Sequence, residues 1–403
     1  MQAFRATRIF LKGQIVVILR STRRGACVLS AALLASVGLV ACSSTGSGTS
    51  GDAIRVGVTT SLTGSFGTYG NMIKDGLEAG LYCSTEGTNE VDGKPIEFVY
   101  ADDGGDPEQT LAAATRMVGD GINILTGTTS SAAAMQLGHF AEQQNLLYIS
   151  GAAGIDDVTG LNANTFRASR QAYQEAAALS SVLEKNNKKT VVLAQDYAFG
   201  QQYASTVTGI LESSGSEVEK VLVPLDTNEF TPYARRISEL KPDLLIVVYY
   251  GDGAPSMWQA MSQQGILDTT TVASVLVEKS HWSIYGDAAE KINFVTHYYP
   301  GAPGGEMNEC LTERVPDADL STHDGFVAAQ QIVHAISTAG PDDVEGMIEA
   351  LNGWSFEAPK GPMTIRSGDH ALLQDMYLVS LSDDDGELVA HTVGNVGSEA
   401  AKP

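Results

Sequence analysis

The stretch Ile122–Gly154 constrains the fold most, because it alternates strand-like and helical segments at the spacing of a parallel α/β sheet. Ile122–Leu125 and Leu146–Ser150 are short apolar runs, which is the pattern of strands buried on both faces. The helical segment Ala132–Gln144 separates them, and a loop of small residues follows each predicted strand. In a parallel sheet these loops lie at the carboxyl ends of the strands, where ligands of open α/β sheets bind.

The loop Thr126–Ser131 is the first candidate binding element. It contains only Gly, Thr and Ser, and it leads directly into a predicted helix. Hydroxyl groups and free backbone N–H groups at a helix N-terminus can hold an anion, because the helix dipole adds to the donors. The same residues would also serve as an ordinary N-cap. The assignment therefore depends on the larger pattern of the chain.

The alternation of strands and helices occurs twice. Ile54–Thr59 and Ile96–Tyr100 are predicted strands that precede the stretch described above. A second series begins after a predicted helix at Ala172–Lys185 and includes the apolar runs Thr190–Gln195 and Leu244–Tyr249. Two such units predict an α/β fold of two doubly wound parallel-sheet lobes, with their strand ends facing across a cleft.

We expect the chain to pass between the lobes three times, near Ser169, near Tyr299 and near Ser355, so that a three-strand hinge permits closure. The segments Pro362–Ile365 and Met376–Leu381 predict a hairpin of two strands in the tail. The predicted boundaries are 53–168 for lobe I, 169–298 for lobe II, 299–354 for a return to lobe I and 355–395 for a return to lobe II.

Residues 1–41 predict a lipoprotein signal peptide. The basic segment Arg20–Arg24 precedes the apolar run Cys27–Val40, which is too short to span a bilayer. The sequence LVAC ending at Cys42 resembles the bacterial lipobox, in which the cysteine carries the lipid. Residues 42–52 form a flexible Gly/Ser/Thr tether. We therefore expect an exported protein, attached to the outer face of the cell membrane by its lipid alone.

The net charge and the absence of catalytic motifs argue against several classes of function. The chain has 403 residues and a net charge of −23, and this acidic excess argues against nucleic acid as a partner. The sequence lacks a Walker loop, an HExxH motif and a GxSxG motif, and its seven histidines show no paired ligand spacing. We expect no catalytic residues, no metal and no cofactor. The enzyme alternative is a lipid-anchored hydrolase or amidase, which a His or Cys beside Ser131 would favour.

The order and spacing of these segments resemble the type I periplasmic binding proteins that deliver branched-chain amino acids to ABC importers. The resemblance runs from Ile54 to about Leu381, and it is most specific in Ser61–Gly70 and in Asp102–Ser150, which aligns without a gap. It implies that the protein captures a small carboxylate or amino acid between two lobes and delivers it to ABC permease subunits. A ligand-sensing receptor subunit that works without transport is the alternative.

The resemblance also implies a ligand site. The hydroxyl of Ser131 and the backbone of the loop at Ala152 would hold the ligand carboxylate. Aromatic side chains from both lobes would close over an apolar body. The residues implied on this basis are Tyr69, Ser130, Ser131, Ala152, Ala153 and Phe199.

The chain departs from the family where the ligand ammonium is expected to bind. Gly154 and Gly253 stand where the family has Thr and Tyr, and Ser274 falls at the position of the family's acidic residue. Glu278 is the first acid available after that position, and Asp252 is a second candidate. A buried ammonium needs a paired carboxylate, so an amino acid ligand depends on one of these acids reaching the cleft.

The first predicted crossing contributes further candidates. Arg170, Gln171 or Tyr173 would face the cleft if the crossing segment lines it, and each is equally compatible with an ordinary position on the protein surface. Of these, Gln171 is included among the predicted ligand contacts.

Two cysteines outside the leader and the lipobox, Cys83 and Cys310, form one even pair in an exported protein. Such thiols are more often paired than free, so we predict a disulfide within the first lobe. Two separate buried thiols are the alternative. The loop disulfide typical of the family is absent, because Gly105 and Ser130 stand at its positions.

Overall fold

The computed structural model describes residues 53–182, 189–224, 227–249 and 253–397. The predictions for the signal peptide, for Cys42 and for the tether fall outside these ranges, and so does Asp252. Within them, none of the helices combines the length and the apolar character needed to cross a bilayer.

The first sheet forms the amino-terminal half of the fold and has the strand order β2-β3-β1-β4-β5-β6. Its strands are β1 (Ile54–Thr60), β2 (Glu90–Val91), β3 (Lys94–Asp102), β4 (Ile124–Gly127), β5 (Leu147–Ser150) and β6 (Thr165–Arg167). The helices between them are α1 (Gly67–Ser84), α2 (Pro107–Gly119) and α3 (Ser131–Gln144). From β3 to β6 all neighbouring strands are parallel, so their carboxyl ends meet at one edge of the sheet.

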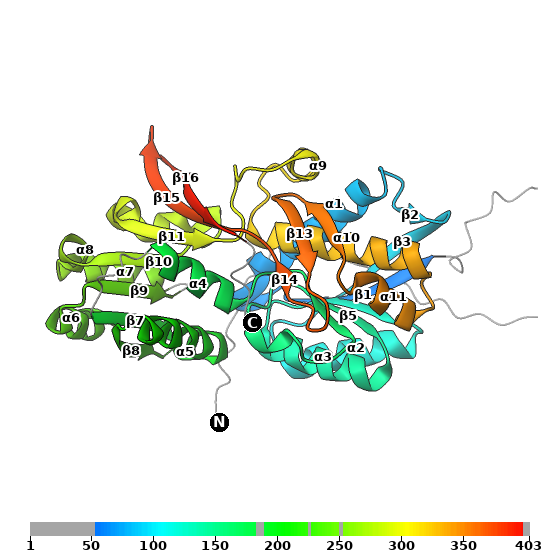
Figure 1. Ribbon diagram of the computed structural model, residues 1–403, viewed down its shortest axis with the longest axis horizontal. Helices are drawn as coiled ribbons and strands as arrows, with labels where there is room; N and C mark the ends of the chain where they lie inside the picture. The colour runs from blue at the N-terminus through cyan, green and yellow to red at the C-terminus, as the bar shows by residue number, and fades with distance from the viewer. Residues whose placement is uncertain (1–52, 183–188, 225–226, 250–252, 398–403) are drawn as a thin grey trace, which may run out of the picture. The chain divides into compact units, whose positions relative to one another are not determined.

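The second sheet has the order β16-β15-β11-β10-β9-β7-β8. Its strands are β7 (Lys189–Gln195), β8 (Glu217–Val223), β9 (Leu244–Val248), β10 (Thr271–Val275), β11 (Ile292–Thr296), β15 (Met376–Asp384) and β16 (Glu387–Val396). Its helices are α4 (Ala172–Val182), α5 (Ala198–Ser213), α6 (Thr231–Leu240), α7 (Ala254–Gln263), α8 (Ile266–Thr269) and a 3-10 segment at Lys279–Lys291. Strands β7 to β11 are parallel, which confirms the predicted α/β class with two parallel-sheet lobes (Figure 1).

The tail departs from the sequence expectation. Strand β13 (Gly361–Ile365) pairs with β12 (Ser355–Ala358) and β14 (Leu372–Leu373) in a small sheet of its own, whereas β15 pairs with β11 and β16. The predicted hairpin is therefore wrong. The apolar side chains of β12 and β13 pack into the core of the first sheet, so the chain passes to the second sheet only after Leu373.

Helix α10 (Leu320–Ala339) follows α9 (Glu306–Arg314) in the chain and precedes α11 (Val344–Leu351). It is buried along most of its length. It packs closely on α1 at three glycines. A Cβ at Gly76, Gly80 or Gly325 would lie between 2.0 and 2.6 Å from a backbone atom of the opposite helix. Only glycine permits this approach, because real Cβ contacts are not so short.

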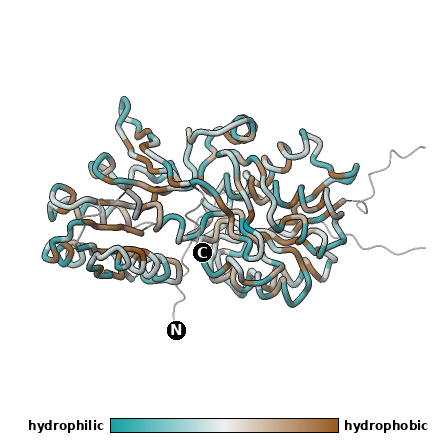
Figure 2. Tube along the Cα trace, in the orientation of Figure 1, coloured by the Kyte–Doolittle hydropathy of each residue, from teal (hydrophilic) through white to brown (hydrophobic). Residues whose placement is uncertain are grey.

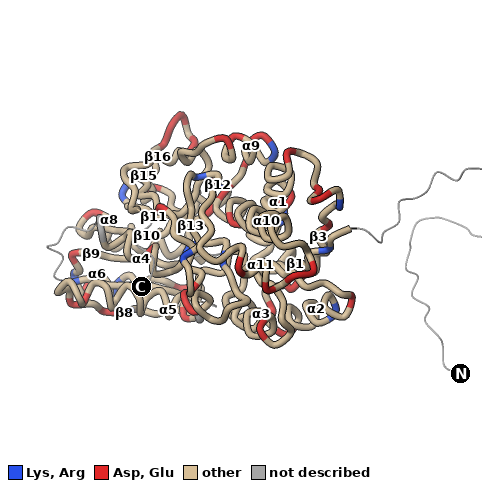
Figure 3. Tube along the Cα trace, turned by 45° about the vertical axis from the view of Figure 1, so that its right-hand side comes forward, with Lys and Arg blue, Asp and Glu red and all other residues tan. Residues whose placement is uncertain are grey.

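Apolar side chains of the strands form the cores, as the hydropathy colouring shows along β7, β9 and β10 (Figure 2). Acidic residues outnumber basic ones over the described chain and gather in loops and helix ends (Figure 3). The predicted pair Cys83 and Cys310 is joined by a disulfide with a Cα–Cα distance of 6.2 Å. This bond links α1 to α9.

Candidate ligand-binding site

The loops at the carboxyl ends of β1, β3 and β4 are held together by Asp103, which is completely buried. Its carboxylate accepts hydrogen bonds from the hydroxyls of Ser61 at 2.7 Å and Thr128 at 2.6 Å, and from the N–H of Gly105 at 2.8 Å. Three loops far apart in sequence therefore share one buried acceptor. This network fixes the position of the loop that leads into α3.

Helix α3 begins with a pair of serines that have different roles. Ser130 is the N-cap, and its hydroxyl accepts from the N–H of Ala133 at 3.4 Å. Ser131 is the first helical residue and is half-buried, and no partner for its hydroxyl is recorded among the described residues. The capping function thus falls to Ser130. The Ser131 hydroxyl is left to interact with a ligand.

The loop after β5 presents backbone donors next to this helix. In the described part of the chain, no hydrogen bond is recorded from the N–H groups of Ala152 or Ala153. Their carbonyls accept from arginines, Ala152 from Arg170 at 3.3 Å and Ala153 from Arg167 at 3.1 Å. The arginines hold the loop through its carbonyls, so its N–H groups remain for an anionic ligand.

Gly154, at the end of this loop, marks a close contact between the two lobes. A Cβ at Gly154 would lie 2.9 Å from the ring of Phe199 and 3.2 Å from the guanidinium of Arg170. Phe199, in the first turn of α5, is buried. The space that the threonine of the family would occupy is therefore taken by an aromatic ring and a cation.

Arg170 is itself held in place by a buried acid. Its Nε donates to Glu175 at 2.9 Å, and both side chains are nearly inaccessible to solvent. Burial raises the pKa of Glu175, while the charge of Arg170 lowers it. The pair fixes a positive group beside the loop where the ligand carboxylate is expected.

Tyr69 and Glu278, two predicted ligand contacts from different lobes, lie next to each other. Burial, and then the neighbouring Glu278 carboxylate, raise the pKa of the Tyr69 phenol well above its ordinary value. Glu278 is only 2% exposed, and its Oε1 contacts the imidazole of His281. Its Oε2 is buried without a hydrogen-bond partner among the described residues. A buried carboxylate oxygen of this kind can receive a ligand cation.

Tyr197 belongs to the same group of residues and was not predicted from the sequence. Burial raises its pKa to about 12, with Arg170 acting in the opposite direction, and its charge also acts on Tyr69. Its ring lies 6.2 Å from that of Phe199. Tyr197 is the N-cap residue of α5 and precedes Phe199 by two residues, so its closeness in sequence to a predicted contact could have identified it.

The remaining predicted contacts are Gln171 and Asp252. Gln171 is fully buried and donates from Nε2 to the hydroxyl of Thr159 at 2.9 Å, which gives its amide a structural partner. Asp252 lies outside the described residues.

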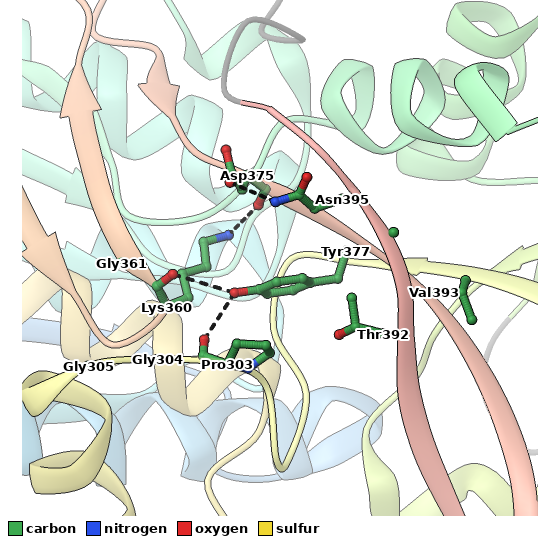
Figure 4. Close-up of a pocket in the computed structure, with 11 residues that line it drawn as sticks. Pro303, Gly304, Gly305, Lys360, Gly361, Asp375, Tyr377, Thr392, Val393 and Asn395 are labelled. Carbon is green, nitrogen blue, oxygen red and sulfur yellow. Dashed lines mark hydrogen bonds between the residues drawn. The ribbon is translucent and has the colours of Figure 1, made fainter.

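A hollow of about 580 Å³ lies away from these residues, between the segment that follows β11 and the strands β13, β15 and β16 (Figure 4). Lys360 lies at its edge, but the amine points into the protein and donates to three acceptors, the backbone oxygens of His297 and Asp375 and the side chain of Gln374. None of the predicted ligand contacts lines this hollow. We therefore place the candidate site at Tyr69, Ser131, the Ala152 loop, Phe199 and Glu278.

The chain is similar to known proteins over most of its length. The family described as "Periplasmic binding protein" matches residues 53–387. The Leu/Ile/Val-binding protein homolog 6 of Brucella suis biovar 1 is 25% identical over 353 residues, covering 83% of this chain and 89% of the relative. The Leu/Ile/Val-binding protein BraC3 of Rhizobium johnstonii is 24% identical over 311 residues, covering 74% of this chain and 83% of the relative.

Solved structures share the fold over most of the chain. An ABC-type branched-chain amino acid transporter from Rhodopseudomonas palustris has a TM-score of 0.76 and 28% identity, covering 87% of this chain and 98% of the other. A solute-binding protein from R. palustris in complex with 4-hydroxybenzoate has a TM-score of 0.78 and 22% identity, covering 86% and 97%.

Proposed function

Because the chain belongs to the periplasmic binding protein family, in its type I branched-chain amino acid group, we propose that it is the solute-binding lipoprotein of an ABC importer. It captures an amino acid or a related small carboxylate between its lobes and delivers it to the membrane permease. It does not transform its ligand.

The observation that carries the proposal is the Glu278 carboxylate. It is buried beside Tyr69, and its Oε2 has no hydrogen-bond partner in the described part of the chain. Burying an unpaired charged oxygen is unfavourable, and a ligand ammonium would supply the missing partner. An α-amino group on the ligand is therefore the simplest way to satisfy this site.

The opposite end of the ligand would carry a carboxylate. The Ser131 hydroxyl, the N–H groups of Ala152 and Ala153 and the start of α3 supply donors to an anion. The rings of Tyr69 and Phe199 supply apolar surface between the two polar ends. Such a site would bind a zwitterion with a modest apolar side chain.

An aromatic acid is the second candidate ligand. Structural neighbours bind 4-hydroxybenzoate and benzoate, and three aromatic residues, Tyr69, Tyr197 and Phe199, meet in this site. An aromatic acid would leave Oε2 of Glu278 without a partner, which is why we favour an amino acid.

Calorimetry with matched ligands tests the proposal. Leucine and 2-hydroxy-4-methylpentanoate share a carboxylate and an apolar body but differ in the ammonium, and leucinamide keeps the ammonium while losing the carboxylate. We expect leucine, or a close analogue, to bind with a Kd near 1 µM, about −8 kcal/mol, and both partial analogues to bind at least tenfold more weakly. Tight binding of benzoates with no binding of amino acids would instead establish the aromatic-acid alternative. Turnover of any ligand would contradict a pure binding function.

The lipid anchor is tested separately. If Cys42 carries the lipid, Cys42→Ser should release the protein from the membrane fraction without altering ligand affinity, because the tether separates it from the fold. Retention of the variant at the membrane would contradict the anchor. An importer role, rather than a sensor role, predicts loss of ligand uptake when the protein is deleted and recovery when it is restored.

A further inference from the structure

A second group of buried polar side chains lies between the segment that follows β11 and helix α10. His297 follows the last residue of β11, and His323 and Asp324 are adjacent in α10. Nε2 of His297 is hydrogen-bonded to Oδ1 of Asp324 at 2.9 Å, and Nδ1 of His323 lies 3.6 Å from the same oxygen. One potential ligand atom from each of the three residues lies within 4.8 Å of the other two. We refer to these three residues as the His-His-Asp cluster.

The cluster contains polar atoms that the protein does not satisfy. His323 and Asp324 are both completely buried. Neither ring nitrogen of His323, nor Oδ2 of Asp324, has a hydrogen-bond partner within the described ranges. The ring of Tyr298 stacks on His323 with its centroid 5.0 Å away, which fixes the imidazole plane but offers its nitrogens no partner. Buried polar atoms without partners are uncommon, and three of them in one cluster call for a water or an ion to satisfy them.

The donor set suits a metal ion. Two imidazoles and one carboxylate, brought together from two segments of the chain, form a ligand set typical of Zn²⁺.

Nearby positively charged side chains oppose the binding of a divalent cation. Lys360 donates to the backbone oxygen of His297 at 2.8 Å. Arg170 also acts on His297, but its charge is offset by Glu175 at 2.9 Å. These charges reduce the affinity for a dication without occupying the cluster.

We propose that His297, His323 and Asp324 form a binding site for a divalent transition-metal ion, with Zn²⁺ as the favoured ion. Tetrahedral ligands at the 2.0–2.2 Å distances of Zn²⁺ lie about 3.4 Å apart, so small side-chain shifts would close the cluster around the ion. The fourth position would hold water. The ion would join the segment leaving the second sheet to a helix packed on the first, and it is independent of the solute site.

Metal titration of the full-length, tag-free protein tests the site. After treatment with EDTA and its removal, Zn²⁺ is expected to bind with 1:1 stoichiometry and a Kd of about 1 µM or lower, and to raise Tm as a ligand specific to the folded state does. His323→Phe preserves a ring against Tyr298 and removes both nitrogens, so Zn²⁺ affinity should fall at least tenfold. His334→Phe is the matched control, because His334 lies on the same helix outside the cluster and stacks on Trp354.

Asp324→Asn provides a second variant should His323→Phe fail to fold, and it should also weaken Zn²⁺ binding at least tenfold. The proposal is overturned if neither Zn²⁺ nor Co²⁺ binds the EDTA-treated protein or raises its Tm, since water would then satisfy the cluster. It is equally overturned if His323→Phe and Asp324→Asn both fold and keep the parent affinity. Solute binding is measured separately on the metal-free protein, so a failure to bind metal would not contradict the proposed transport function.

Discussion

Replacing Glu278 by Gln distinguishes the two ligand classes most sharply. The substitution keeps the size of the side chain and its contacts beside Tyr69, but it removes the negative charge. Glu278 is 2% exposed, so an ammonium paired with it would lie in a medium where the interaction is poorly screened. A hydrogen bond to a charged group contributes about 1.5–3 kcal/mol, and breaking a buried ion pair costs about 3–5 kcal/mol.

These magnitudes predict a loss of about 3 kcal/mol for an amino acid ligand, or roughly a hundredfold in Kd. A ligand with a micromolar Kd would then bind near 0.1 mM, which calorimetry at high protein concentration still resolves. A simple carboxylate should bind Glu278→Gln as well as the parent, or better, because a like charge has been removed. The Tm should change little, because Gln has the same size as Glu and its amide can still contact His281 and Tyr69.

The reasoning is refuted if an amino acid binds the parent tightly and binds Glu278→Gln with the same affinity. That outcome would mean that the ammonium is held elsewhere, for example by carbonyl oxygens or by Asp252. Leucinamide sharpens the comparison, because its binding depends on the ammonium alone and should show the same proportional loss.

Three further changes test the other parts of the structure. Ser131→Ala should weaken ligand binding ten- to a hundredfold in calorimetry, with little change in Tm. Ser130→Ala should instead lower the free energy of unfolding by about 1 kcal/mol in thermal melts, because the N-cap is lost. The reverse pattern would show that the proposed site is wrong. Removing the disulfide by Cys83→Ser with Cys310→Ser should destabilise the protein by about 2–5 kcal/mol, because the bond closes a long loop, and an unchanged Tm in non-reducing buffer would contradict this. Asp319 has a pKa raised to about 7, foremost by burial, so its contribution to stability is fully present below the ordinary carboxyl pKa of about 4 and is lost as the pH rises through 7. Asp319→Asn should therefore lose less Tm than the parent between pH 4.5 and 8, and an identical pH profile would argue against the shift.

The local pattern of the sequence predicted most of the fold, because a buried parallel strand can be recognised from its own apolar run. A run such as Leu244–Val248 is apolar throughout, since helices cover both faces of the sheet. The tail was harder because strand pairing there is not local. Pro362–Ile365 and Met376–Leu381 are close in sequence and were predicted to pair, yet β15 extends the second sheet beside β11, about 80 residues earlier in the chain. Periodicity identifies a strand but carries no information about its neighbour.

The candidate site was likewise predictable only where it depends on local sequence. The loop that leads into Ser131 was visible as a small-residue run before a helix, but the adjacency of Tyr69 and Glu278 depends on how two lobes meet. The His-His-Asp cluster is the extreme case. His297 and His323 are 26 residues apart, and no spacing rule for metal ligands spans that interval, so the sequence predicted no metal. The cluster forms because the polar residues near the start of α10 lie against the end of β11. Since α10 is buried along most of its length, these polar residues are buried as well. Buried polar groups that lack partners therefore point to sites that sequence motifs cannot show.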